Sequence, residues 1–273
     1  MDSLQRRCPT FLDNLIYGPG PKIISFVLNS QINSVKTPDM MKLWGYRPNA
    51  NCPLCSLPKC TLHHILVNCK FALEQGRYNW RHDSVLANIE VSFQKFVLEV
   101  NQRKLTETSL KPLYRSFVRA GQKLPLQTTN KPKEGLLTKA NDWVLLVDFE
   151  HKKIVFPPHI YPTNQRPDII FWSRMSRSVI LLELTCCAEE GVKAAQLRKQ
   201  VRYHELVENV NANNWNATLL TIEVGARGLI GNGTWRAFLK LGLSSQSATS
   251  LCKTLSVVVA RCSSMRSASL KTA

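Results

Sequence analysis

Four metal-ligating side chains within one short segment constrain this chain more than any other feature of its sequence. They follow the spacing C-x2-C-x8-H-x4-C and are Cys52, Cys55, His64 and Cys69. Two thiolates from a tight turn, joined by an imidazole and a third thiolate from a short helix, form a tetrahedral donor set that suits Zn²⁺. Because four protein ligands leave no open position, we expect a structural zinc site. Cys60 and His63 lie in the same segment, so the fourth ligand stays open between His64, His63 and Cys60.

The composition favours an intracellular protein with a polyanionic partner. The 36 Lys and Arg residues against 19 Asp and Glu leave a net charge of +17, which favours nucleic acid as the partner. Nine cysteines is an odd number, and residues 1–7 are polar and basic, so neither a disulfide framework nor a secretory signal is expected. The longest apolar stretch, 179–188, is shorter than the ~20 residues of a membrane helix and contains Glu183. We expect no membrane segment.

The order of the predicted elements indicates a mixed α/β fold with a small zinc knuckle in front of it. Apolar spacing predicts a helix over 79–100, and a basic loop with a short helix at 113–120 follows. The remaining predicted elements are strands at 143–147, 154–156 (paired with the preceding one), 168–172, 179–185 and 217–224, and helices at 189–210 and 235–241. We expect four regions: a polymerase or linker remnant at 1–45, the knuckle at 46–75, an α/β domain at 76–243 and a Ser-rich tail at 244–273.

Two acidic residues are predicted to face each other across a β-hairpin. If the turn is centred between Met175 and Ser176, Asp168 lies directly opposite Glu183, with Cβ atoms ~5 Å apart. Two facing carboxylates between apolar residues repel each other, and burying them costs several kcal/mol unless a cation joins them. Such a pair suits Mg²⁺, which binds a few carboxylates and keeps positions for water and phosphate oxygens. In a competing interpretation the two acids are structural partners of Arg166 or Arg174.

The next predicted helix carries one charged residue on its packing face. At 100° per residue, a single stripe contains Val192, Ala195, Lys199, Tyr203, Leu206 and Val210. An inward lysine near two carboxylates is suited to hold a phosphate or a nucleophilic water. Lys193, on the flank of the stripe, is the weaker candidate, and a lysine that only snorkels at the helix edge is the structural alternative.

The motifs in this order resemble the C-terminal region of non-LTR retrotransposon polyproteins that carry a restriction-like endonuclease after the reverse transcriptase. The resemblance spans residues 46 to about 210. It comprises the CCHC knuckle, Arg81-His82-Asp83, Arg166-Pro167-Asp168, Glu183, and the helix with Lys199 and Tyr203. The nuclease part resembles the PD-(D/E)xK superfamily, which implies a restriction-endonuclease-like core: a central mixed sheet flanked by helices.

The resemblance implies a nuclear enzyme that nicks DNA so that the free 3′ end primes reverse transcription, in this case in a fragment without the polymerase. It implies Asp168 and Glu183 as ligands of a catalytic Mg²⁺ and Lys199 as the catalytic lysine. Arg81, His82 and Arg166 are the expected nucleic-acid contacts, although Arg81 and His82 equally suit a solvated turn. DNA is the expected partner, with the element's RNA as a second candidate and no small-molecule ligand.

One departure from the superfamily favours an alternative function. The superfamily commonly has a lysine two residues after the second acid, where this chain has Thr185. Lys199 is the expected replacement, with Lys193 as the second choice. The alternative function, which Thr185 and the missing polymerase favour, is that of a catalytically decayed, zinc-containing remnant that binds nucleic acid without cleaving it.

Overall fold

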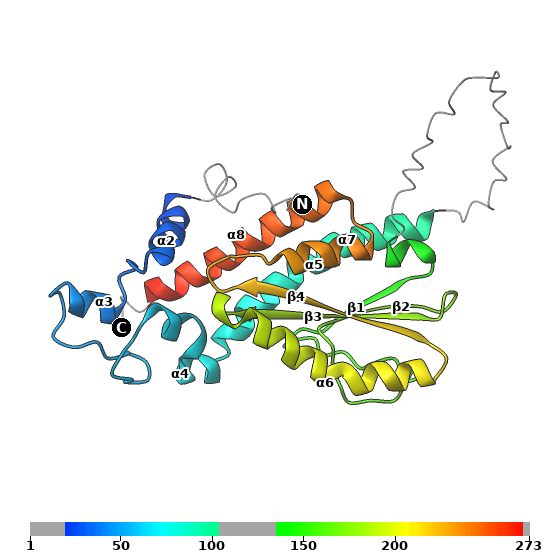
Figure 1. The fold of residues 1–273 in the computed structure, drawn as a ribbon, viewed down its shortest axis with the longest axis horizontal. Coiled ribbons are helices and arrows are strands. Elements are labelled where there is room, and N and C mark those ends of the chain that lie inside the picture. Colours follow the sequence, from blue (N-terminus) through cyan, green and yellow to red (C-terminus); the bar gives the residue numbers. More distant parts are fainter. Residues whose placement is uncertain (1–19, 104–134, 270–273) are drawn as a thin grey trace, which may run out of the picture.

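A four-stranded mixed sheet flanked by helices forms the centre of the molecule (Figure 1). The structure is a computed structural model and describes residues 20–103 and 135–269. The elements are α2 (Pro21–Gln31), α3 (Pro38–Leu43), the π-helix η1 (His64–Asn68), α4 (Lys70–Glu74), α5 (Arg77–Gln102), the 3₁₀ turn η2 (Leu136–Lys139), β1 (Val144–Val147), β2 (Ile169–Ser173), β3 (Ser178–Cys187), the 3₁₀ turn η3 (Glu189–Gly191), α6 (Val192–Ala212), β4 (Asn216–Gly225), α7 (Asn232–Leu241) and α8 (Ser245–Ser269). The predicted mixed α/β class is confirmed.

The strand order is β1-β2-β3-β4, and the connections explain the directions of the strands. β1, β2 and β3 are antiparallel neighbours, whereas β4 runs parallel to β3. Parallel neighbours need a crossover, and α6 supplies it between β3 and β4. The pairing of β2 with β3 includes Ile169 with Leu182 and Trp172 with Val179. Continuing this register by one residue places Asp168 opposite Glu183, so the predicted hairpin register is confirmed.

The two faces of the sheet are covered by different helices (Figure 1). α5, α7 and α8 cover one face, where Phe93, Phe171 and Phe238 form the aromatic centre of the larger core. α6 covers the opposite face with a stripe that includes Tyr203 and Leu206. Its buried residues belong to the predicted packing face, and Asp168 and Glu183 lie on the same side of the sheet by alternation.

The C-terminal residues form a core helix, so the prediction of a Ser-rich tail from residue 244 was wrong. In α8, Leu251, Leu255 and Val259 recur at helical spacing and are buried against the larger core. Two serines that suggested a tail are buried instead, since Ser256 and Ser263 donate their hydroxyl protons to the carbonyl oxygens of Gly228 and Ala226. The prediction gave weight to the serine content and overlooked the apolar residues at helical spacing.

Two smaller sequence predictions have different outcomes. Residues 154–156 do not form a strand, because the Ile154 N–H donates to Asp148 Oδ1 at 2.8 Å rather than to a neighbouring strand. The short helix predicted at 113–120 lies outside the described residues.

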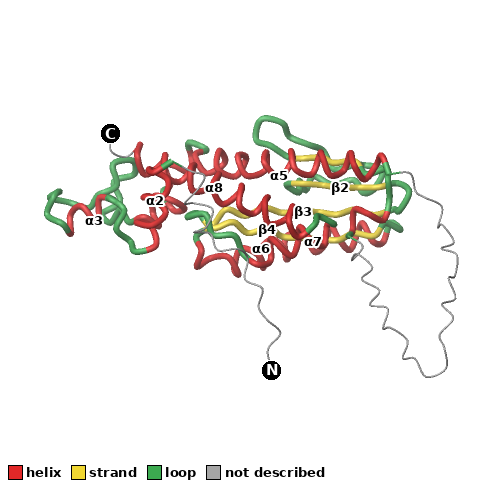
Figure 2. The backbone as a smooth tube through the Cα atoms, turned by 90° about the horizontal axis from the view of Figure 1, so that it is seen from above, coloured by secondary structure: helices red, strands yellow, loops and turns green. Residues whose placement is uncertain are grey.

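The knuckle segment and the first two helices lie at one end of the molecule, beyond the sheet (Figure 2). Phe26 and Val27 of α2 form a small buried cluster with Leu62, Leu66 and Ala260. Ala260 belongs to α8, so this long helix contacts both the sheet side and the knuckle side of the molecule. The knuckle segment is therefore attached to the α/β core through a packed contact.

We predict that Leu255→Ala lowers the free energy of unfolding by about 2–5 kcal/mol, because it leaves a cavity in the larger core where this side chain is fully buried. Urea denaturation followed by circular dichroism measures the change. Leu197→Ala, on the exposed side of α6, is the matched control and should change stability by less than about 0.5 kcal/mol. Equal effects of the two substitutions would show that α8 does not belong to the cooperative core.

Candidate functional site

Asp168 and Glu183 converge on the α6 side of the β2–β3 hairpin. The Asp168 N–H donates to Glu183 Oε1 at 3.0 Å, and Asp168 Oδ2 accepts the Leu184 N–H at 2.7 Å. The Glu183 side chain is completely buried, whereas the Asp168 side chain is 15% exposed. The pair therefore has one oxygen-rich edge that faces solvent and one that is enclosed by protein.

Lys199 supplies the positive charge that such a pair needs. Its Nζ lies 3.5 Å from Asp168 Oδ2 and forms a hydrogen bond with Glu183 Oε2. The neighbouring Tyr203 hydroxyl donates to the Arg166 carbonyl oxygen at 3.0 Å. Lys193 is exposed near the start of α6. Thr185 stands where a lysine would be close to the acids in the chain. The structure brings Lys199 to the acids from α6 instead.

His82 joins this cluster from α5, a position that sequence reasoning missed. Its Nε2 lies 3.5 Å from Asp168 Oδ2, and its Nδ1 lies 3.4 Å from Asp83 Oδ1. Asp83 is held in turn, because its Oδ2 accepts the Glu150 N–H at 3.2 Å. The sequence expectation placed His82 at a phosphate or in a solvated turn. The signal that could have indicated this role is Asp83, directly after His82. Its carboxylate lies beside Nδ1 of the imidazole while Nε2 faces Asp168.

Two of the expected nucleic-acid contacts have other partners in the structure. Arg81 is 1% exposed, and its guanidinium donates to Ser263 Oγ and to the Cys186 carbonyl oxygen. A side chain that α5, α8 and β3 enclose in this way cannot touch a phosphate, so Arg81 is a packing residue. Arg166 forms a double hydrogen bond with Asp148, with distances of 2.6 and 2.8 Å from Nη2. Its guanidinium is committed to that carboxylate, so the interpretation of Asp168 and Glu183 as its ion-pair partners is wrong.

Burial and mutual repulsion set the protonation of the cluster. Burial, together with the negative charge of Asp168, raises the pKa of Glu183 to about 7, against the lowering effect of Lys199. Burial also acts to raise the pKa of Asp168, but His82 and Lys199 outweigh it and hold that pKa below the usual value. For His82, burial acts to lower the pKa. The hydrogen bond and the negative charge of Asp168 outweigh this effect, so the pKa of His82 is raised. The cluster therefore places an ionised acid beside one that takes up a proton near neutral pH.

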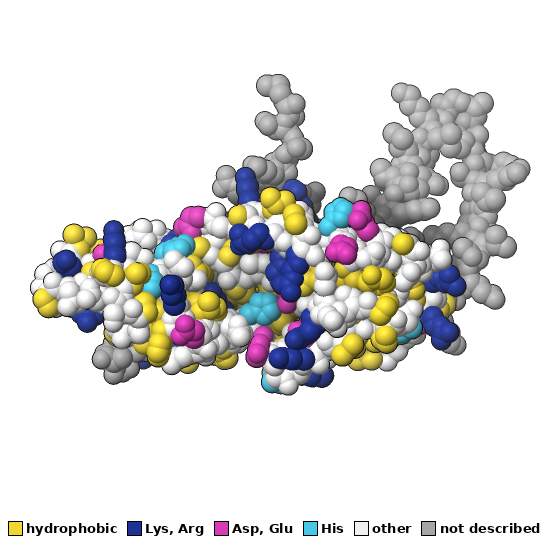
Figure 3. All heavy atoms as spheres, turned by 90° about the horizontal axis from the view of Figure 1, so that it is seen from below, with side chains coloured by type: hydrophobic (Ala, Val, Ile, Leu, Met, Phe, Trp, Pro, Cys, Tyr) yellow, Lys and Arg dark blue, Asp and Glu magenta, His cyan; other side chains and the backbone are white. Residues whose placement is uncertain are grey.

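Figure 3 shows the surface of the molecule on the α6 side of the sheet. Lys and Arg side chains gather around a hollow in this face, with a histidine and carboxylates at its edge. The Lys199 and His82 side chains remain 22% and 26% exposed, so a charged ligand can approach them from outside.

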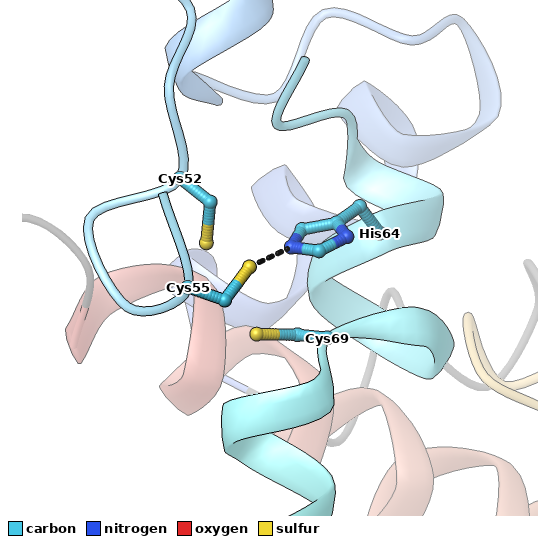
Figure 4. Close-up of side chains that lie close together, drawn as sticks. All are labelled: Cys52, Cys55, His64 and Cys69. Carbon is cyan, nitrogen blue, oxygen red and sulfur yellow. Dashed lines mark hydrogen bonds between the residues drawn. The ribbon is translucent and has the colours of Figure 1, made fainter. Parts of the chain in front are cut away.

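The second cluster is the group of four side chains that the cysteine spacing predicts. Cys52, Cys55, His64 and Cys69 point toward one another, and their ligand atoms all lie within 4.8 Å of one another (Figure 4). His64 Nε2 faces the thiols and lies 3.3 Å from Cys55 Sγ. Such a group can hold a metal ion and is compatible with zinc. His63 is exposed and Cys60 stands outside the group, so the geometry favours His64 as the fourth ligand.

Local backbone features explain why these donors converge. The turn after Cys55 passes through Ser56, whose φ is +58°, and Ser56 N–H donates to the Cys52 carbonyl oxygen at 2.9 Å. Thr61 Oγ1 accepts the His64 N–H at the start of the helical segment. The Tyr78 hydroxyl accepts the Cys69 N–H at 3.0 Å, which fixes the last ligand to α5.

The protonation of the donors also suits a metal. Burial, with a smaller contribution from His63, lowers the pKa of His64, so the imidazole is neutral near pH 7, as a ligand must be. Burial raises the pKa of the Cys69 thiol to about 11. A metal would therefore displace a proton from this thiol when it binds.

Comparisons with known proteins supply no relative. No protein-family model matches the sequence, and a comparison with curated proteins likewise finds no match. None of the helices within the described residues is both long and apolar enough to cross a membrane. A function must therefore be inferred from the geometry of the two clusters.

We predict that the purified chain holds one zinc ion, which atomic absorption can count. Cys69→Ser should lower the zinc content well below one per chain, because a hydroxyl is a much poorer zinc ligand than a thiolate. Cys60→Ser is the matched control, since Cys60 is also buried in the knuckle but stands outside the group. If Cys60→Ser loses as much zinc as Cys69→Ser, the ligand set of three cysteines and His64 is wrong.

We predict that the metal-free protein loses stability as the pH rises from about 5 to 8. The pKa of Glu183 is about 7 in the fold and 4.5 ordinarily, so the native state binds more protons in this window, and raising the pH disfavours it. The raised pKa of His82 acts in the same direction, whereas the lowered pKa of His64 acts against it and keeps the net decrease below that of the first two groups alone. We expect a decrease on the order of 1–3 kcal/mol in the free energy of unfolding, measured by urea denaturation at each pH.

The matched comparison for this pH effect uses two glutamine substitutions. Glu183→Gln should flatten the dependence, because it removes the titrating group and keeps its shape. Glu205→Gln, at an exposed position of α6, should leave the dependence unchanged. A parent profile that rises with pH, or one that Glu183→Gln does not alter, would contradict the assignment.

Proposed function

We propose that this chain is a divalent-metal-dependent endonuclease that nicks DNA. The observation that carries the proposal is the convergence of Asp168, just before β2, Glu183 of β3 and Lys199 of α6 at a partly exposed edge. Paired acids beside a lysine are the groups that hydrolysis of a phosphodiester requires: ligands for a hard cation and a fixed positive charge for the phosphate.

Each residue has a role that its position supports. Asp168 and Glu183 would hold Mg²⁺, which supplies charge neutralisation and a bound water of lowered pKa when present. Lys199, now shared between the two acids, would bind a non-bridging phosphate oxygen and stabilise the charge that develops there. Tyr203 orients the segment before Asp168 through the Arg166 carbonyl oxygen. His82 holds Asp168 from the solvent side.

The wider role follows from the resemblance of the motifs to retrotransposon polyproteins. We propose target-site nicking in the nucleus, with the nicked strand as primer for reverse transcription by a polymerase outside this chain. The cysteine–histidine cluster would hold a structural zinc ion and help to place the DNA, while Lys and Arg side chains grip its backbone. The element's RNA is a further proposed partner.

A second function has a specific observation in its favour. Lys199 already pairs with both acids, and Thr185 stands where the superfamily commonly has its lysine. A closed ion-pair network of this kind would stabilise the hairpin without a metal. The chain would then be a zinc-containing nucleic-acid-binding protein whose nuclease core no longer cleaves.

We predict that the protein converts supercoiled plasmid to the nicked form with Mg²⁺ or Mn²⁺. Asp168→Asn should lower the rate by a factor on the order of 10² or more, because loss of a metal ligand removes several kcal/mol of transition-state stabilisation. Lys199→Met should do the same while plasmid binding persists. Gel electrophoresis follows both reactions.

Glu208→Gln, an exposed substitution on the same helix, is the control for these assays. Nicking by Asp168→Asn at the parent's rate would point to a contaminating nuclease and refute the proposal. Tight plasmid binding by the parent, with no nicking under either metal, would favour the second function.

A further inference from the structure

Two aromatic side chains stand on the surface at the end of the molecule that is distant from the sheet. Trp44 and Tyr46 follow α3 and are 38% and 72% exposed, respectively. Their ring centroids are 6.4 Å apart with planes at 79°, so the rings meet edge to face. We call this pair the aromatic tip. α3 marks its position in Figures 1 and 2.

A well-formed helix end holds the aromatic tip in place. The Tyr46 N–H donates to the Met41 carbonyl oxygen at 2.8 Å, and the Gly45 N–H donates to the Lys42 carbonyl oxygen at 3.0 Å. Gly45 between the rings has a φ of +78°, a conformation that other residues rarely adopt. This pattern is the Schellman motif, which fixes the backbone on both sides of the glycine. The two rings are therefore preorganised rather than carried on a loose loop.

The exposure of the aromatic tip is unfavourable unless a partner covers it. Aromatic side chains contribute large apolar areas, and each Å² left in water forgoes about 25 cal/mol. Within the described residues, neither ring belongs to any of the four buried hydrophobic clusters. A rigid, exposed ring pair that adds nothing to a core indicates a binding surface.

The charges around the aromatic tip identify the kind of partner. Lys42 lies on α3 just before the pair, and Arg47 follows it directly. In the sequence from 32 to 60, Asp39 is the one acidic residue, against Lys36, Lys42, Arg47 and Lys59. A surface that combines aromatic faces with excess positive charge complements nucleobases and phosphates together, whereas an apolar protein surface would match only the rings.

We propose that the aromatic tip binds single-stranded nucleic acid by stacking unpaired bases on Trp44 and Tyr46, with Lys42 and Arg47 near the adjoining phosphates. Base faces are hidden in a duplex and free in a single strand, so stacking selects unpaired nucleotides. The planes of the two rings are nearly perpendicular, so each ring would take a different base. This site is separate from the acid pair and does not depend on the proposed cleavage.

The test measures binding of the full chain to fluorescein-labelled 12-nucleotide single strands, one of DNA and one of RNA, and to the matching DNA duplex. Fluorescence anisotropy gives each Kd at several salt concentrations. The double variant Trp44→Ala/Tyr46→Ala should weaken single-strand binding by about 30-fold or more, because it removes the stacking of two bases. Duplex binding should change less than threefold. The two single strands distinguish DNA from RNA as the source of the bases.

Leu43→Ala is the matched control, since Leu43 is an exposed apolar residue beside the tip without an aromatic face. It should change single-strand binding less than twofold. Binding is measured without added Mg²⁺ or Mn²⁺, where the proposed cleavage cannot contribute, so failure of the nuclease proposal and failure of this one are distinguishable. Circular dichroism and zinc content confirm that each variant folds.

Several outcomes would overturn the proposal. It is wrong if the double variant binds single strands as tightly as the parent, or loses duplex binding to the same extent as single-strand binding. A loss in Leu43→Ala equal to that of the double variant would show that the apolar surface in general, and not the aromatic faces, supports the binding, and would also contradict the proposal. A third variant, Trp44→Phe/Tyr46→Phe, keeps the aromatic faces and should retain binding, and a tenfold loss there would also contradict stacking.

Discussion

The burial of Glu183 opposite Asp168 is the constraint on which the centre of this structure depends. Two carboxylates at facing positions of a hairpin repel each other, and the inner one has no contact with water. The fold offsets this cost with backbone N–H donors from Asp168 and Leu184 and with the ammonium group of Lys199. The position of α6 across the hairpin is thus an electrostatic requirement as well as a packing one.

Helix α5 connects this acid pair to the knuckle through three nearly consecutive residues. Tyr78 holds the backbone of the last ligand, Cys69, while the Arg81 guanidinium lies 5.7 Å from the Tyr78 ring centroid and donates to β3 and α8. His82 then reaches Asp168. A buried guanidinium is costly unless it is hydrogen-bonded, and the Arg81 donors to Ser263 and to the Cys186 carbonyl oxygen connect α5 to both α8 and β3.

The sequence predicted what depends on local periodicity and missed what depends on tertiary contacts. Alternation and a symmetric turn placed Asp168 opposite Glu183, and the 100° stripe placed Lys199 on the inner face of α6. Nothing local distinguished Arg81 from a surface arginine, because its partners are Ser263 and Cys186, distant in the chain. The same reason explains α8. Its serines suggested a tail, and the core surface that its apolar residues cover is formed by segments distant in the chain.

The position of Lys199 bears on whether the acid pair is catalytic or only structural. In a purely structural acid pair, the cation would be expected to be as fully buried as Glu183 is. Lys199 and Asp168 instead keep part of their surface in water, on a face where further basic side chains surround a hollow. An ammonium group at that boundary can move from a carboxylate to an incoming phosphate with little loss of hydration. The partial exposure of Lys199 and Asp168 therefore favours a site that exchanges partners over one that is permanently closed.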